Sequence, residues 1–319
     1  MIVTFTPNPS LDRTACLPVR LARGGVQRLA DLTSEPGGKG VNVARAAHLA
    51  GHDVLAVLPA PRHDPILAAL TERGVPCRNV EVPHFVRTNL TLTEPDGTTT
   101  KLNEPGSVLS EGDATRLLDV LVEVAADAAW VVLAGSLPPG APPDWYAELV
   151  RALRPLHVKI AVDTSDGPLA RLAEAFDDAA PDLLKPNSEE LAQLTGTDAD
   201  LLEAAAAAGD PEPSIAAARV LVDRGVTTVL ATLGGAGAVL VDTDGAWSAL
   251  PPSIQPRSTV GAGDAAVAGY VMGDVDGLDA PGRLARAVAY GSGAAALAGS
   301  ALPSPGQTHP EQVVVTPHG

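Results

Sequence analysis

Short apolar runs recur along the chain and alternate with longer segments whose apolar residues follow a helical spacing. The runs occupy residues 2–5, 53–58, 128–135, 158–163, 182–187, 227–232 and 237–242. Segments between them, such as 113–128 and 214–225, place apolar residues three and four positions apart, as amphipathic helices do. We therefore predict an α/β fold with a mainly parallel sheet and helices on both faces. In such sheets, ligands bind beyond the carboxyl ends of the strands.

One region departs from this alternation. Within residues 87–106, Leu90 and Leu92 alternate with polar residues, and the Pro-Asp-Gly sequence at 95–97 marks a turn. This pattern predicts a hairpin with one half-buried face. The segment 11–34 also lacks a helical pattern. The two segments either form a small sheet that projects from the main domain and covers its site, or are two ordinary surface excursions.

Charge and composition exclude several classes of partner. The formal net charge is −16 and no run of basic residues occurs, which argues against a nucleic-acid or anionic-membrane partner. No apolar run approaches membrane-spanning length, and the start of the chain lacks the pattern of a signal peptide. Cys16 and Cys77 have no metal-site spacing. We predict a cytoplasmic protein in which any phosphate site is locally basic.

The sequence STVGAGDAAVAGY at residues 258–270 combines glycines with one carboxylate at the start of a small-residue helix. Gly261 and Gly263 permit backbone conformations that turn amide groups toward one point at the mouth of that helix. Such a point suits an anion, yet Asp264 adds a negative charge beside it. The combination makes chemical sense if Asp264 takes a proton next to a phosphate.

Two other glycine-rich stretches do not match the common nucleotide motifs. The sequence PGGKGVN at 36–42 has glycine where a P-loop needs serine or threonine. The sequence TLGGAGAVLV at 232–241 leads into an apolar run instead of a helix, so it is not a dinucleotide fingerprint. A P-loop enzyme and a dinucleotide enzyme are therefore both disfavoured.

The sequence DLLKPNSEEL at 182–191 has both a structural and a functional interpretation. Asn187 is placed to cap a helix that starts at Ser188, and Glu190 would complete a capping box. The same geometry also presents oxygen ligands to Mg²⁺ or its waters at the end of a strand. Lys185 would then meet a phosphate of a bound nucleotide.

Taken together, these segments resemble the ribokinase-like (PfkB) family of sugar kinases, and specifically its phosphosugar branch. The resemblance follows the family's order over nearly the whole chain. Its pieces are TPNPSLD, PGGKGVNVARAAHLAG, VRTNLTLTEPDG, GSLPPG, DTSDGPL, LLKPNSEEL, TLGGAGAVLVD and STVGAGDAAVAG.

The resemblance implies a Rossmann-like ribokinase fold in a single domain over residues 1–319, with a discontinuous β lid from about 11–34 and 86–105. It also implies ATP-dependent phosphorylation of a sugar hydroxyl. Asp264 matches the family's base, and the amides of Gly261, Ala262 and Gly263 would cradle the transferring phosphoryl group.

The resemblance further assigns binding roles to single residues. Asn187 and Glu190 match the motif that places Mg²⁺, through water. The residues that match the nucleotide-binding segment are Thr232, Gly234 and Gly237. On the sugar side, Asp12, Gly38 and Asn42 match positions that hold hydroxyl groups, and the cations expected around a phosphate already on the sugar are Lys39, Arg87 and Arg28.

Lys39 also bears on the choice of phosphosugar. A lysine in GGKGVN resembles the 1-phosphofructokinases and tagatose-6-phosphate kinases of the branch, whereas its 6-phosphofructokinases resemble a GGGG version. The expected reaction converts fructose 1-phosphate and ATP to fructose 1,6-bisphosphate and ADP. The alternatives are a tagatose-6-phosphate or fructose-6-phosphate kinase and, more remotely, a non-catalytic sugar-phosphate sensor. The resemblance also implies a homodimer formed through the lid.

Overall fold

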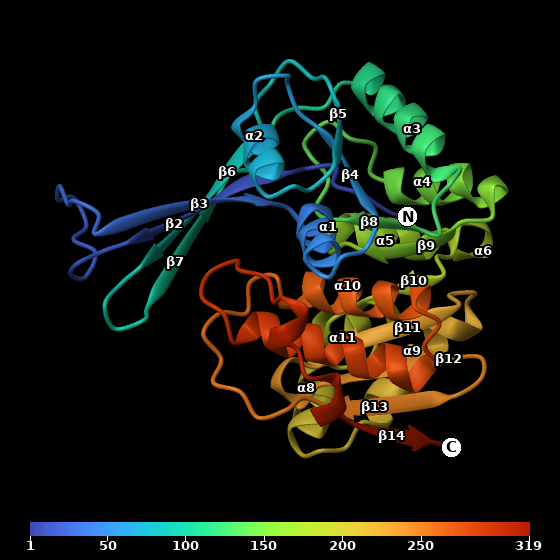
Figure 1. Ribbon diagram of the computed structural model, residues 1–319. Coiled ribbons are helices and arrows are strands. Elements are labelled where there is room, and N and C mark those ends of the chain that lie inside the picture. The colour runs from blue at the N-terminus through green and yellow to red at the C-terminus, as the bar shows by residue number, and fades with distance from the viewer.

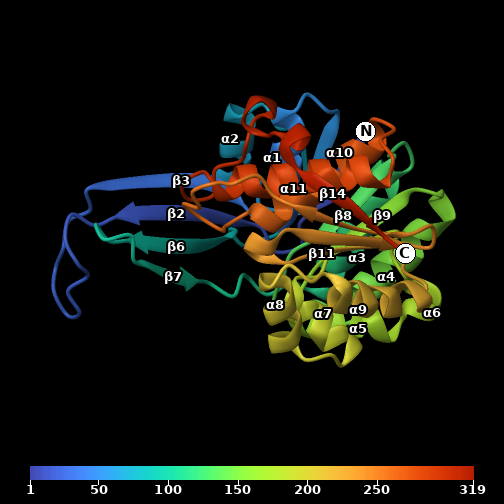
Figure 2. The same ribbon diagram turned by 90° about the horizontal axis from the view of Figure 1, so that it is seen from below.

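The computed structural model describes residues 1–319, and its main feature is one large sheet between two layers of helices (Figures 1 and 2). In spatial order its strands are β14 (Val314–His318), β13 (Ala246–Leu250), β12 (Ala238–Asp242), β11 (Thr228–Thr232), β10 (Leu183–Leu184), β9 (Lys159–Asp163), β8 (Trp130–Ala134), β1 (Ile2–Phe5), β4 (Val54–Pro59) and β5 (Cys77–Val80). Neighbouring strands from β11 to β5 are parallel. The strands β12, β13 and β14 are added antiparallel.

The seven apolar runs that predicted strands all form strands of this sheet. Continuous apolar runs are expected where both faces of a strand are covered by helices. The hydrophobic pattern did not reveal β5, β13 and β14. The edge strands β5 and β14 are short and carry polar residues, and Ser248 interrupts β13. None of the three therefore contains an uninterrupted apolar run.

Helices cover both faces of the large sheet (Figure 2). One layer contains α1 (Lys39–Leu49), α2 (Pro65–Glu72), α10 (Ala262–Val275) and α11 (Ala280–Ala295). The other contains α3 (Glu111–Ala125), α4 (Trp145–Leu153), α5 (Asp166–Glu174), α6 (Phe176–Ala179), α7 (Ser188–Thr195), α8 (Ala199–Ala207) and α9 (Glu212–Asp223). Short 3-10 turns complete the chain at η1 (Arg154–Leu156), η2 (Gly234–Ala236), η3 (Pro305–Gln307) and η4 (Pro310–Gln312). No helix has the length and apolar character needed to cross a membrane.

The two helical layers create two hydrophobic cores, one on each face of the sheet. Within β1, Ile2 belongs to the core beneath α1 and α10, whereas Val3 and Phe5 belong to the core on the opposite face. This alternation follows from the two-residue period of a strand. Burial on both faces makes the large sheet a rigid base for the loops at its edge.

A separate four-stranded sheet projects from one side of the molecule (Figure 1). Its order is β3 (Asp31–Gly37), β2 (Ser10–Cys16), β6 (Arg87–Thr93) and β7 (Thr99–Asn103). The pair β2 and β6 is parallel, and the outer pairs are antiparallel. The segments 11–34 and 87–106 therefore form one small sheet and are not two separate excursions. Its role as a lid stays a prediction.

The parallel strands bring chemistry-bearing residues to one edge of the large sheet. Asp163 ends β9, Lys185 follows β10 and Thr232 ends β11. An isolated bridge joins Asn187 to Thr232, and the Thr232 amide donates to the carbonyl of Pro186 at 3.0 Å. Because adjacent parallel strands end on the same side, residues far apart in sequence become neighbours there.

The helix α10, which begins at this edge, packs unusually closely against α11. A Cβ atom built on Gly269 would lie 2.6 Å from the carbonyl oxygen of Arg286 and 2.9 Å from the Cα of Ala287. Side chains on both helices near this point are otherwise small, including Ala265, Ala266 and Ala287. The missing side chain at Gly269 therefore sets the distance between the two helices.

We expect Gly269→Ala to lower the free energy of unfolding by roughly 1–3 kcal/mol, because overpacking outweighs the gain in helix propensity. Urea unfolding measures the change. The matched control is Gly112→Ala on α3, where the nearest atom to the added Cβ is 3.9 Å away. That control should be neutral or stabilising by up to about 1 kcal/mol. A Gly269→Ala protein as stable as the wild type would contradict the packing argument.

Candidate active site

A buried carboxylate holds two lysines at the centre of the site. The Oδ1 atom of Asp163 lies 2.7 Å from Nζ of Lys39 and 3.4 Å from Nζ of Lys185. Burial by itself would raise the pKa of Asp163, but the two ammonium groups outweigh burial and lower it. Asp163 is therefore ionised and fixes both lysines. Sequence analysis gave this residue no role, although a carboxylate directly after a buried parallel strand was a usable signal.

Asp264 is a second carboxylate close to the first, with different electrostatics. It lies in the first turn of α10, and its Oδ2 accepts a hydrogen bond of 2.8 Å from Nδ2 of Asn42 on α1. Burial, followed by the negative charge of Asp163, raises the pKa of Asp264 to about 6, despite opposing effects of Lys39, Asn42 and Lys185. Two neighbouring carboxylates with pKa values pushed apart are typical of an acid–base site.

The start of α10 forms a cradle for an anion beside Asp264. Gly261 caps the helix with a φ of 78°, in the left-handed region that favours glycine. The amides of Gly263 and Asp264 have no backbone acceptor, whereas that of Ala262 donates to the carbonyl of Thr259 at 3.4 Å. A Cβ built on Gly263 would lie 3.4 Å from Nζ of Lys185. Free amides next to an ammonium group form a suitable phosphate site.

Lys39 belongs to this central group in the structure. Burial alone would lower its pKa, but the charges of Asp163, Asp264 and Glu190 outweigh burial and raise it. The ammonium is therefore a permanent positive charge, and a third of its side-chain surface (34%) remains exposed. The predicted contact of Lys39 with a sugar phosphate must thus coexist with its ion pair to Asp163.

Asn187 and Glu190 form the capping box that begins α7. The Oδ1 of Asn187 accepts from the Glu190 amide at 2.8 Å, and Oε2 of Glu190 accepts from the Asn187 amide at 2.9 Å. The structural interpretation of this motif is therefore confirmed. The Oε1 of Glu190 takes no part in the cap.

The side chains at this position fit a magnesium ion only as a partial ligand set. No cluster of three or more His, Cys, Asp or Glu side chains forms a metal site. Mg²⁺ usually keeps several waters and binds one or two carboxylates together with substrate phosphates. The free oxygen of Glu190 matches that sparse pattern, and a complete protein cage is absent.

The predicted nucleotide residues lie directly beside Asn187. Thr232 pairs with Asn187, and the chain then turns through η2, closed by a hydrogen bond of 2.8 Å from the Leu233 amide to the Gly237 carbonyl. Gly234 and Gly237 both have positive φ, at 58° and 96°. A side chain at Gly237 would also collide with the carbonyl oxygen of Ala249. The two glycines therefore serve a tight turn at the strand end.

Three of the predicted sugar-side residues, Asp12, Gly38 and Arg87, lie at the base of the small sheet. The Oδ1 of Asp12 accepts hydrogen bonds from Ser10 at 2.8 Å and from Asn89 at 2.9 Å. Its carboxylate fills the space beside Gly37, which precedes the α1 cap Gly38. These contacts hold Asp12 in place from both neighbouring strands.

Arg87 also lies at this base, at the start of β6. It donates to the carbonyl of Glu104 at 3.1 Å, while its buried Nε has no hydrogen-bond partner. Burial lowers the pKa of Arg87, and the charges of Asp12 and Glu104 oppose that effect. The unpaired Nε leaves this guanidinium with an unused donor, as expected of an anion ligand.

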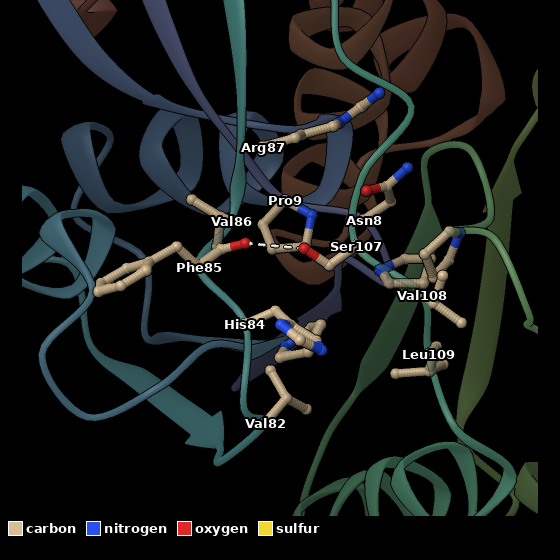
Figure 3. A pocket seen from close by; sticks show the side chains of 13 residues that line it. Asn8, Pro9, Val82, His84, Phe85, Val86, Arg87, Ser107, Val108 and Leu109 are labelled. Atoms are coloured by element: carbon tan, nitrogen blue, oxygen red, sulfur yellow. Dashed lines mark hydrogen bonds between the residues drawn. The ribbon is translucent and has the colours of Figure 1, made fainter.

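A small pocket adjoins the base of the small sheet (Figure 3). Arg87 is the only predicted site residue in its lining, and its guanidinium points away from His84 and Val82. The pocket is therefore separate from the Asp264 group. Arg28 is also apart: it is exposed on the connection between β2 and β3, away from the other predicted residues.

Comparisons with known proteins show the family to which the chain belongs. The family model described as pfkB family carbohydrate kinase matches residues 8–305. The 1-phosphofructokinase of Xanthomonas campestris is 35% identical over 89% of this chain and 88% of its own, and that of Rhodobacter capsulatus is 36% identical over 95% and 93%. Phosphofructokinase-2 from Escherichia coli in complex with fructose-6-phosphate superposes with a TM-score of 0.82 at 28% identity, covering 92% and 93%. The chain therefore belongs to the pfkB family of carbohydrate kinases.

Proposed function

We propose that this protein transfers the γ-phosphoryl group of ATP to fructose 1-phosphate, giving fructose 1,6-bisphosphate and ADP. The observation that carries the chemistry is the pair of buried carboxylates beside the start of α10, of which only Asp264 has a pKa close to neutrality. The choice of sugar is supported by relatives named 1-phosphofructokinase that span most of the chain.

In this proposal Asp264 takes the proton from the attacking hydroxyl of the sugar. Its raised pKa matches that task, because a general base works best when its pKa lies near the working pH. The hydrogen bond from Asn42 holds one carboxylate oxygen, so the other oxygen is available to the substrate hydroxyl. Asp163 stays ionised beside two lysines and is a poor proton acceptor by comparison.

The segment Gly261–Ala262–Gly263 would hold the transferring phosphoryl group. The unpaired amide of Gly263, the N-terminus of α10 and the Lys185 ammonium all place positive charge at one point. Stabilising charge in this way typically contributes about 10²–10³ in rate per donor. Lys39 adds a second ammonium, which contacts the same Asp163 oxygen as Lys185.

Thr232, Gly234 and Gly237 would bind the nucleotide, and Asn187 and Glu190 would place Mg²⁺ through water. The pairing of Asn187 with Thr232 supports this proposal because it puts both sets of residues at one strand edge. A bound Mg²⁺ neutralises charge on the phosphate oxygens of ATP. The capping box keeps Glu190 oriented for that purpose.

On the sugar side, Asp12, Gly38 and Asn42 would contact hydroxyl groups, and Arg87 with Lys39 would meet the phosphate already present. The unpaired Nε of Arg87 supports its part in this assignment. Arg28 stays a prediction with no contact in this chain to support it. Fructose 6-phosphate is the competing substrate, since the structure of phosphofructokinase-2 from Escherichia coli holds it.

We also propose that two copies associate through the small sheet. Its register places Leu32 opposite Ala15, which faces Leu92 on β6, while Leu102 on β7 faces Leu90. Opposed residues share a face, so the four leucines lie on one face, which is mainly apolar but also carries the exposed Arg13 opposite Leu90. The other face carries Asp12 and Asn89. Leu32 and Leu102 are 42% and 54% exposed. A second copy of the same sheet would cover this apolar face.

Turnover should fall as the pH drops through about 6. Asp264 has a raised pKa, so it is ionised and active above that value and becomes protonated and inactive below it. The value of kcat/KM should fall tenfold per pH unit on the acid side, which steady-state kinetics measures. Asp264→Asn should reduce turnover by about 10²–10⁴. If the residual activity of Asp264→Asn shows the same acid limb as the wild type, the titrating group is the substrate phosphate. That result would contradict the assignment of this pKa to Asp264.

Among phosphosugars, fructose 1-phosphate should give the highest kcat/KM. The measurement is Mg²⁺-dependent ADP production with fructose 1-phosphate, fructose 6-phosphate and tagatose 6-phosphate at matched concentrations. Arg87→Met should raise KM more than it lowers kcat, because it removes a binding group remote from the transferred phosphoryl. Preference for another sugar would overturn the substrate assignment alone, and binding of all three without turnover would favour a sensor.

Sedimentation velocity at micromolar concentration should show a dimer. Leu102→Asp should dissociate it, because a carboxylate would be buried in an apolar interface. The matched control is Leu250→Asp on β13, which replaces an equally exposed leucine (54%) away from the small sheet. A monomeric wild type, or equal dissociation in both variants, would contradict an interface on this face.

A further inference from the structure

The side chain of Arg45 links Asn42, which donates a hydrogen bond to Asp264, with strand β3 of the small sheet. Arg45 lies on α1, is 7% exposed and makes three hydrogen bonds. Its Nη1 donates to Asn42 Oδ1 at 3.3 Å and to the Pro36 carbonyl at 2.9 Å. Its Nη2 lies 2.6 Å from Oε2 of Glu35 on β3. Sequence analysis gave Arg45 and Glu35 no role.

The contacts of Asn42 permit only one orientation of its amide group. A guanidinium can only donate hydrogen bonds, and an ionised carboxylate can only accept them. Asn42 therefore turns Oδ1 toward Arg45 and Nδ2 toward Asp264, where it donates at 2.8 Å. Without the guanidinium, the amide can rotate and present its oxygen to the carboxylate, which would lose its donor.

Burial of the Arg45 charge is costly, and Glu35 is itself half-buried, which argues against a role in stability alone. Glu35 also binds Arg73 through both oxygens, at 2.7 Å and 3.1 Å, so two guanidinium groups share one carboxylate. Ion pairs of this kind are weak evidence for stabilisation, because desolvation offsets the attraction. On the neighbouring strand, Asp12 lies opposite Glu35. The network thus ends where the sugar-side residues begin.

We propose that Arg45 is a positioning residue for proton transfer, orienting Asn42 toward Asp264 and tying that orientation to strand β3. The inference rests on the proposed role of Asp264 as the base. Arg45 itself touches neither the base nor the reacting atoms. Its effect is passed through one amide group, so it should appear as a change in how Asp264 titrates.

Several charged groups face the residues of this network. Asp264 is surrounded by Asp163, Lys39 and Lys185, and Arg45 by Glu35, Arg73 and Asp12. A donor to an ionised carboxylate lowers its pKa, and loss of that donor raises it. Removing Arg45 should therefore move the acid limb of kcat/KM to higher pH. A purely structural defect would lower activity equally at every pH.

The test compares pH profiles of the wild type with Arg45→Met and Arg45→Lys. Arg45→Met should move the acid limb upward by roughly one pH unit, the scale of one charged hydrogen bond. Activity lost at pH 6 should then be largely recovered at pH 8.5. Arg45→Lys keeps the charge but cannot hold three acceptors in the same fork, so it should move the limb in the same direction.

The matched control is Arg73→Met, which removes an equal charge on the far side of Glu35. Its acid limb should coincide with that of the wild type. Asn42→Ala should reproduce the Arg45→Met shift, and the double variant should shift no further. If the acid limb of kcat/KM moves in Arg45→Met but not in Arg45→Lys, the effect comes from the positive charge alone. That result would overturn the proposal that Arg45 orients the Asn42 amide. Equal shifts in Arg45→Met and Arg73→Met would overturn it as well.

If Arg45→Met does not fold, Arg45→Lys and Asn42→Ala provide the test. An acid limb of kcat/KM that coincides with that of the wild type in both variants would refute the proposal. Two further measurements separate its failure from failure of the proposed function. A wild type without phosphosugar turnover would refute the function itself. A fully active Asp264→Asn would refute the base and this inference with it. If both assignments hold and the Arg45 variants titrate as the wild type does, only the role of Arg45 fails.

Discussion

The ion pair between Asp163 and two lysines is the interaction around which the site is organised. Asp163 is almost fully buried, and its position at the end of β9 allows Lys39 from α1 and Lys185 from the next strand to reach it together. Each lysine brings its own element toward the same point. Two ammonium groups then face two carboxylates, so the opposite charges of the group offset one another.

The same ion pair accounts for the difference between the two carboxylates. The two lysines lower the pKa of Asp163, with which they form ion pairs. Burial and the negative charge of Asp163 raise the pKa of Asp264. Identical side chains a short distance apart therefore acquire opposite tendencies. Nothing in the chemistry of aspartate alone distinguishes the two pKa values, which differ because of the charged groups around each carboxylate.

Much of the fold was predictable because strands that are buried on both faces consist of continuous apolar runs. The runs that became β1, β4 and β8 to β12 are of this kind. The helix after GAGD was also foreseen, since glycine followed by small residues marked its start. The strands β5, β13 and β14 were missed because none of them contains an uninterrupted apolar run. No local pattern records that a tail will extend a sheet edge.

For the candidate site, sequence reasoning located the residues on motifs but not the contacts between them. Asn42 was assigned through the family resemblance, whereas Asp264 and Lys185 stood out because glycine or capping patterns surround them. Asp163 did not, because a single aspartate after a strand resembles many others until a lysine approaches from another segment. Arg45 lay inside a quoted motif, yet its importance depends on Glu35, which faces it across a turn. Longer-range partners of this kind are fixed by topology, not by spacing.

The connectivity of the small sheet has a consequence for how the chain folds. Its central pair joins β2 to β6 across the whole of β3, α1 and the β4–α2–β5 unit. Closing so long a loop costs entropy before its contacts reward it. The pairing of β1 with β8 in the large sheet closes a longer loop still. Both sheets therefore depend on non-local contacts, and a nascent chain completes neither of them until residues far along the sequence have been synthesised.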